Sequence, residues 1–120
     1  MPLDQANWPS TETVEIDETT ALLIRARGFL ERGWCRNAVA RDAAGNGVWP
    51  TDEKAVAWCA GGALIGAGMH HDLVSCLTHP AVRRLWAVIG DDCIAPFNNR
   101  QETVEPVLAA FDRAIAADGT

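Results

Sequence analysis

The stretch Trp58-Cys59-Ala60-Gly61-Gly62-Ala63-Leu64 lies in a run, residues 55–69, that has no polar or charged side chain between Lys54 and His70. A helix that is apolar on every side must be covered on every side. The run therefore predicts a central helix over about residues 52–67, with the other helices packed against it. Each interior glycine of a helix costs about 1 kcal/mol relative to alanine. Close packing, or a break near Gly61, is expected to compensate.

Apolar residues at helical spacing predict three further helices. The first begins near Asp17, a good N-cap residue, and stops at Gly33. The second begins at Pro80, which suits a first helical position, and ends at Gly90. The last follows Thr103 as its N-cap. The expected fold class is therefore mostly α, with about four helices.

The remaining segments change character. Val39 and Val48 flank a run of turn-forming residues, which predicts one short β-hairpin over about residues 37–49. The turn formers of residues 93–102 predict a loop before the last helix. Residues 1–12 lack periodicity and are expected to form a flexible N-terminal arm. Residues 13–120 are then a single helical domain, in keeping with the chain length of 120 residues.

Composition narrows the class of protein. The chain is 48% hydrophobic and 22% charged, which is ordinary for a globular domain. Its net charge of −6 opposes attraction to nucleic-acid phosphates and anionic lipid, so no nucleic-acid partner is expected. The apolar run is shorter than the roughly 20 residues that cross a bilayer, so no membrane association is expected. The first twenty residues show no signal-peptide pattern, and a cytoplasmic location is expected.

Four cysteines are widely spaced and are expected to be reduced and mostly buried: Cys35, Cys59, Cys76 and Cys93. Cys59 is the candidate nucleophile among them. A reactive thiolate needs a helix N-terminus or a cationic neighbour to lower its pKa, whereas the predicted helix places Cys59 about two turns inside an apolar segment. The pattern favours a packing role, and catalysis with a folded-back histidine is the alternative.

A second candidate is a zinc site in the segment His70–His79, which holds all three histidines of the chain. Cys76 and His79 are spaced like two zinc ligands, and His70, His71 or Asp72 could complete the set of four. The spacing is not that of a recognised zinc motif. The prediction is therefore no cofactor, with zinc as the alternative.

Phe97, Asn98 and Asn99 are the candidate binding residues, because function often resides on loops. The two asparagines could equally be turn formers that lead to the helix cap.

Four patches together resemble a family of small uncharacterised proteins of bacterial and phage genomes, classed only as a domain of unknown function. They cover most of the chain from about residue 17 onward, and the family's Trp-Asn-Asp loop is Phe97-Asn98-Asn99 here. The resemblance implies the fold and the order of elements, and it implies no activity. The patches are Glu31-Arg32-Gly33-Trp34-Cys35, Ala40-Arg41-Asp42-Ala43-Ala44-Gly45, Ala57-Trp58-Cys59-Ala60-Gly61-Gly62-Ala63-Leu64, and Ile94-Ala95-Pro96-Phe97-Asn98-Asn99 with Thr103, Val107 and Phe111-Asp112-Arg113-Ala114-Ile115.

The favoured function is a non-enzymatic module that binds or regulates a protein partner. This hypothesis rests on an acidic chain, a small fold and the lack of a catalytic motif. By analogy with the bacterial and phage genomes that carry the similar proteins, the module could serve a mobile element. The alternative is a small enzyme or zinc protein that uses Cys59 or the His70–His79 segment.

Overall fold

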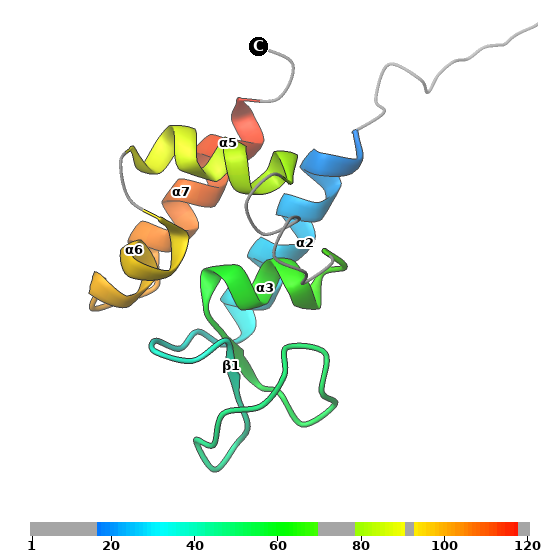
Figure 1. Cartoon of the computed structure of the whole chain (residues 1–120), viewed down its shortest axis with the longest axis vertical. Helices are drawn as coiled ribbons and strands as arrows, with labels where there is room; N and C mark the ends of the chain where they lie inside the picture. Colours follow the sequence, from blue (N-terminus) through cyan, green and yellow to red (C-terminus); the bar gives the residue numbers. More distant parts are fainter. Residues whose placement is uncertain (1–16, 70–78, 91–92, 118–120) are drawn as a thin grey trace, which may run out of the picture.

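The computed structural model describes residues 17–69, 79–90 and 93–117. These residues form five helices and one pair of short strands, so the expected mostly-α class with a short β-hairpin is confirmed. In Figure 1 the helices occupy the upper part of the molecule, and the strands with the loop that joins them extend below α3. The predicted arm, residues 1–12, lies outside the described residues.

The first described helix, α2, spans Glu18–Arg32 and agrees with the prediction at both ends. The Asp17 side chain accepts a hydrogen bond from the backbone N–H of Thr20, which satisfies one of the unpaired donors of the first turn. At the other end, Gly33 is the C-cap and donates its N–H to Phe29. Local capping signals therefore set the length of this helix.

The strands β1, Ala40–Arg41, and β2, Ala57–Trp58, pair in antiparallel orientation, with Ala40 opposite Trp58. The residues after α2 lie beside this pair of strands as a third segment, because Trp34 forms a parallel bridge with Trp58 of β2. The predicted hairpin is thus present, but its second strand lies beyond residues 37–49. Within that range the chain makes a single bridge, between Arg41 and Gly47.

The apolar helix α3 spans only Ala60–Gly66, so the prediction of a helix from about residue 52 is wrong for its first half. Asp52, expected near the cap, instead accepts the N–H of Lys54 in a turn. The next residues are held in extended form by partners on both sides. The N–H of Val56 donates to Arg41, and the N–H of Trp58 donates to Gly33. Long-range pairing therefore overrides the local helical pattern.

Three more helices follow, α5 over Pro80–Ile89, α6 over Ile94–Arg100 and α7 over Glu105–Ala116. The bounds of α5 agree with the prediction, including Pro80 in its first turn. The predicted loop at residues 93–102 is wrong, because most of it is α6. Pro96 is tolerated there because it falls in the first turn, where no helical donor is needed. The last helix begins after Val104, one residue past the predicted cap at Thr103.

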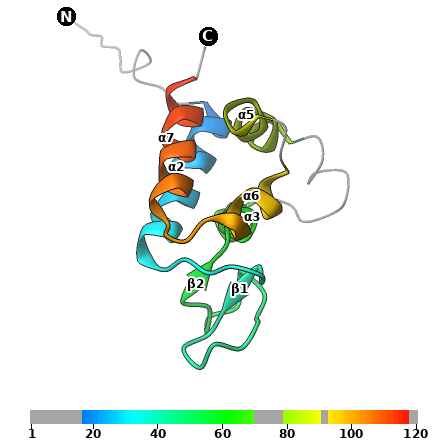
Figure 2. The same cartoon turned by 90° about the vertical axis from the view of Figure 1, so that its left-hand side faces the viewer.

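The helices share one core. Helix α2 packs against α3, α5 and α7, while α3 is covered by α2 and α6. Figure 2 shows α7 running alongside α2, with α5 across the upper end and the strands beneath. The centre is therefore occupied by α2 as much as by the apolar α3. Within the described ranges, no helix has the length and apolar character needed to cross a bilayer.

Candidate functional site

Asn98 lies at the point where three separate segments of the chain meet. Its side chain is fully buried, and its Oδ1 accepts hydrogen bonds from the indole N–H of Trp34 at 2.8 Å and the backbone N–H of Ala60 at 3.0 Å. Its Nδ2 donates to the carbonyl of Cys35 and to Oδ1 of Asn99, both at 3.1 Å. An amide side chain has two donors and two acceptor positions, so Asn98 is saturated by protein groups.

The predicted binding residues are thus placed together on α6, but in different surroundings. Asn99 accepts the backbone N–H of Asn37 at 2.8 Å, and Phe97 is half-buried against the core. None of Phe97, Asn98 and Asn99 lines either of the hollows described below. The side chains of Asn98 and Asn99 form hydrogen bonds between α6 and the segment that follows α2. Their proposed role in binding stays a prediction.

Cys59 is the N-cap of α3, which corrects the expectation that it lies two turns inside a helix. Its Sγ accepts the N–H of Gly62 at 3.2 Å. Burial nevertheless raises the pKa of the Cys59 thiol, and the N–H groups of Gly62 and Gly61 only partly oppose this effect. At neutral pH the site holds a thiol rather than a thiolate, which disfavours a nucleophilic role.

Cys35 lies beside this cap and is buried as well. Burial raises its thiol pKa, and a charge on Cys59 raises it further. The guanidinium of Arg41 acts in the opposite direction, because it lies within hydrogen-bonding reach of the thiol. The thiol donates to the carbonyl of Ala38 at 3.6 Å. The two cysteines therefore form one buried cluster next to Asn98.

An apolar hollow of about 300 Å³ opens between α3, α5 and α6, and Cys59 forms part of its wall. We call it the apolar hollow. Its wall contains thiols but no carboxylate, imidazole or amine among the described residues, so it can bind an apolar group but has no general acid or base. The described residues that line it are Val39, Cys59, Gly61, Leu64, Ile65, Met69, Val82, Trp86, Cys93, Ile94 and Ala95.

Of the predicted zinc ligands, only His79 lies within the described residues, and His70, His71 and Cys76 lie outside them. His79 is the N-cap of α5, and its Nδ1 accepts the N–H of Ala81 at 3.0 Å. This hydrogen bond leaves Nε2 as the nitrogen that could meet a ligand. Among residues 17–69, 79–90 and 93–117, no three His, Cys, Asp or Glu side chains are placed to hold a metal ion.

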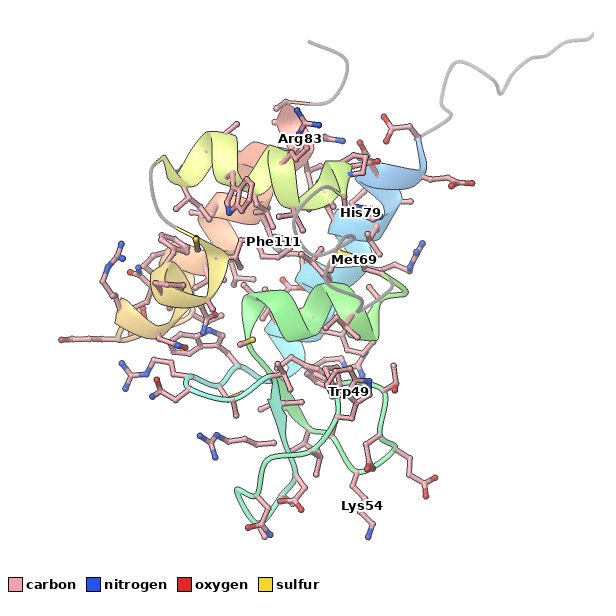
Figure 3. The ribbon with its side chains drawn as sticks, viewed as in Figure 1. Trp49, Lys54, Met69, His79, Arg83 and Phe111 are labelled. Carbon is pink, nitrogen blue, oxygen red and sulfur yellow. The ribbon has the colours of Figure 1, made fainter. Side chains whose placement is uncertain are left out.

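His79 also borders a second hollow, of about 480 Å³, which Glu18 and Arg25 line from α2. Figure 3 shows His79 and Met69 between α3 and α5, in front of α2. Arg25 donates from its Nε to the carbonyl of Ala67 across this gap. The wall of this hollow is mixed, because apolar residues such as Leu22 and Met69 line it beside the charged ones. No hydrogen bond described for it links Glu18, Arg25 and His79 to one another.

The sequence predictions missed the hydrogen bonds of Trp34 and Cys35 with Asn98, and they missed the apolar hollow that Cys59 lines. The available signal was that these residues fall in patches of the family resemblance, at residues 31–35, 57–64 and 94–99. Those patches are distant in sequence and meet around Asn98. Periodicity alone gives no sign of such a meeting point.

The model of a family described as a family of unknown function (DUF6197) matches residues 15–117. No curated protein and no solved structure matches the chain. The site must therefore be interpreted from its own geometry.

Proposed function

Since the chain belongs to a family of unknown function (DUF6197), which supplies no activity, we propose from the geometry that it is a non-enzymatic binding module. The apolar hollow is the observation that carries this proposal. Its occupant is one or two apolar side chains of a basic protein partner. In a bacterial or phage setting, such a module regulates that partner by contact in the cytoplasm.

Three properties of the apolar hollow support this occupant. Its volume of about 300 Å³ is at the lower end of the range for ligand sites, which suits a small apolar group better than a cofactor. Val39 at its edge is 38% exposed, so apolar surface continues outside the hollow. The net charge of −6 favours encounter with a basic partner.

The thiol chemistry of the wall favours binding over catalysis. The raised pKa of Cys59 keeps it protonated near neutral pH, and the lining has no base to activate it. The alternative, a small Cys- or His-dependent enzyme, requires a group that the described wall does not supply.

Gly61 allows a direct test, because it lines the apolar hollow and a Cβ placed there meets no atom within 4 Å. Gly61→Leu should fill the apolar hollow without displacing the backbone. Gly28→Leu is the matched control, since Gly28 is a helical glycine of α2 with equally open surroundings.

The first measurement is an NMR titration of the protein with indole as an apolar probe. We expect shifts of the amides of Gly61, Ile65 and Trp86 in the wild type and in Gly28→Leu, and their loss in Gly61→Leu. The second is affinity purification from the native host. A stoichiometric basic protein retained by the wild type and Gly28→Leu, and lost with Gly61→Leu, would support the proposal. Absence of such a partner, or equal retention by Gly61→Leu, would overturn it.

A further inference from the structure

Cys35 and Cys59 occupy neighbouring positions in the backbone network. The N–H of Trp58 donates to Gly33, and the N–H of Cys35 donates to Trp58, each at 3.1 Å. These bonds create the parallel bridge between Trp34 and Trp58, and each cysteine is the next residue along its own segment. The two cysteines are thus adjacent in space although 23 residues separate them in the printed sequence.

This adjacency is compatible with the geometry of a disulfide. Paired segments run about 4.8 Å apart, and side chains at matching positions of neighbouring strands leave on the same face. A disulfide joins Cα atoms that lie roughly 4.4–6.8 Å apart. Both residues also meet the same stretch of backbone. The Sγ of Cys35 is 3.6 Å from the carbonyl oxygen of Ala38, and the N–H of Cys59 donates to Val39 at 3.2 Å.

The surroundings give the two thiols different roles. Cys59 forms part of the wall of the apolar hollow, so a small neutral molecule inside the hollow would lie against this residue. Cys35 does not line the hollow, but Arg41 lies close enough to stabilise its thiolate. Cys59 is therefore placed to meet an oxidant first, and Cys35 is placed to attack it second.

We propose that Cys35 and Cys59 are a redox pair that a hydroperoxide entering the apolar hollow converts into an intramolecular disulfide. Only the small ionised fraction of Cys59 reacts, because burial raises the pKa of its thiol. Its thiolate attacks one oxygen of hydrogen peroxide and the O–O bond breaks. The hydroxide that leaves takes up the proton lost by the thiol, so that a sulfenic acid and water form. The Cys35 sulfur then attacks the Cys59 sulfur, the S–O bond breaks, and a second water leaves with the remaining thiol proton. Two thiols lose two electrons and two protons, and hydrogen peroxide is reduced to two waters.

The pairing has a structural consequence for the elements around it. It would link the segment after α2 covalently to the cap of α3 and close the loop that contains Trp49. Closing a loop of this length restricts the unfolded chain, so the oxidised form should resist unfolding more than the reduced form. This inference uses the same apolar hollow as the proposed binding function, but its test uses the protein alone, so the two proposals can fail separately.

The test uses the full chain with Cys76→Ser and Cys93→Ser, so that only Cys35 and Cys59 remain. After hydrogen peroxide treatment, we expect an intact mass lower by about 2 Da and a Cys35–Cys59 cross-linked peptide, both reversed by dithiothreitol. The thermal midpoint should rise on oxidation. The added change Cys35→Ser is the control, and it should abolish the cross-link and leave a mass gain of about 16 Da on Cys59.

Wild-type protein treated in the same way keeps the test valid if the double variant folds poorly, because peptide mapping identifies the same pair. If peroxide treatment of the Cys76→Ser, Cys93→Ser protein gave a mass gain without a Cys35–Cys59 cross-link, the proposal would be overturned. The same holds for two thiols that remain unmodified while the protein is folded, or for a wild-type disulfide that joins other cysteines.

Discussion

The indole N–H of Trp34 donates a hydrogen bond of 2.8 Å to Oδ1 of Asn98, joining two residues that are 64 positions apart in the chain. The same oxygen accepts the backbone N–H of Ala60, the first residue of α3. A single buried amide thus sets the positions of the segment after α2, the start of α3 and the middle of α6.

Asn98→Ala should lower the free energy of unfolding by about 3 kcal/mol, because it leaves the Trp34 indole N–H, the Ala60 N–H and the Cys35 carbonyl without partners. Urea unfolding followed by circular dichroism measures the change. Asn46→Ala, in an exposed turn, is the control and should stay within about 0.5 kcal/mol of the wild type. Equal stability of both variants would contradict the proposed network.

Gly62 and Gly61 are neighbours for which we predict opposite responses to alanine. A Cβ at Gly62 would lie well inside contact distance of the Val39 carbonyl oxygen, whereas a Cβ at Gly61 meets nothing within 4 Å. Gly62→Ala should therefore destabilise by at least about 2 kcal/mol through backbone displacement. Gly61→Ala should be neutral or stabilise by up to about 1 kcal/mol, because alanine favours helix. Thermal unfolding of the Gly62→Ala and Gly61→Ala variants measures the difference. Similar midpoints would show that Gly62 does not lie close to the Val39 carbonyl oxygen.

Arg84 and Arg83 form another matched pair on α5. The Arg84 guanidinium donates to the carbonyl of Ala114 and to the hydroxyl of Thr20, so it joins α5 to α7 and α2. Arg84→Met should cost about 1.5–3 kcal/mol, the usual range for hydrogen bonds from a charged group. Arg83→Met, at an exposed position of the same helix, should change stability by less than about 0.5 kcal/mol. Denaturant titration measures the free energy of unfolding of both variants. If Arg83→Met were the less stable of the two, Arg84 would not be the residue that joins these helices.

The raised pKa values of Cys35 and Cys59 predict a stability that declines in alkaline solution. An unfolded thiol loses its proton near pH 8.5, whereas the folded thiols keep theirs to higher pH. Above about pH 8.5 the folded state therefore binds more protons, and the free energy of unfolding falls as the pH rises. Unfolding measured from pH 7 to 10 should show this decline under reducing conditions. Cys59→Ser retains a capping oxygen for the Gly62 N–H and should reduce the slope. An unchanged slope in that variant would argue against Cys59 as its source.

Thiol labelling provides an independent check on the non-enzymatic interpretation. Cys93 is exposed, and Cys35 and Cys59 are buried. At pH 7, iodoacetamide, which is bulkier than hydrogen peroxide, should modify Cys93 before Cys35 and Cys59. It should reach the buried pair only after denaturation, because burial keeps these thiols protonated and covered. Mass spectrometry of the labelled peptides follows the order. Rapid and selective modification of Cys59 in the native protein at pH 6–7 would instead favour a catalytic thiol.

Local signals predicted α2 and α5 well. The caps at Asp17 and Gly33 and the proline at Pro80 act within a few residues, so their effects can be inferred from the chain alone. The same kind of signal failed at α6. Pro96, Asn98 and Asn99 favour turns locally, but partners on other segments hold the two amides in a helix.

The apolar run around Trp58 shows the division most clearly. The sequence by itself determined that most of this run is buried and that its small residues permit close packing, because both follow from the character of its own side chains. Val56 is the exception, since it is 48% exposed. Only the tertiary structure decided that the helix begins at Ala60, with Cys59 at its cap and Trp58 in a strand. The physical reason is that the backbone of Trp58 is paired with Gly33 and Cys35, and such hydrogen bonds depend on segments that meet only in the folded chain.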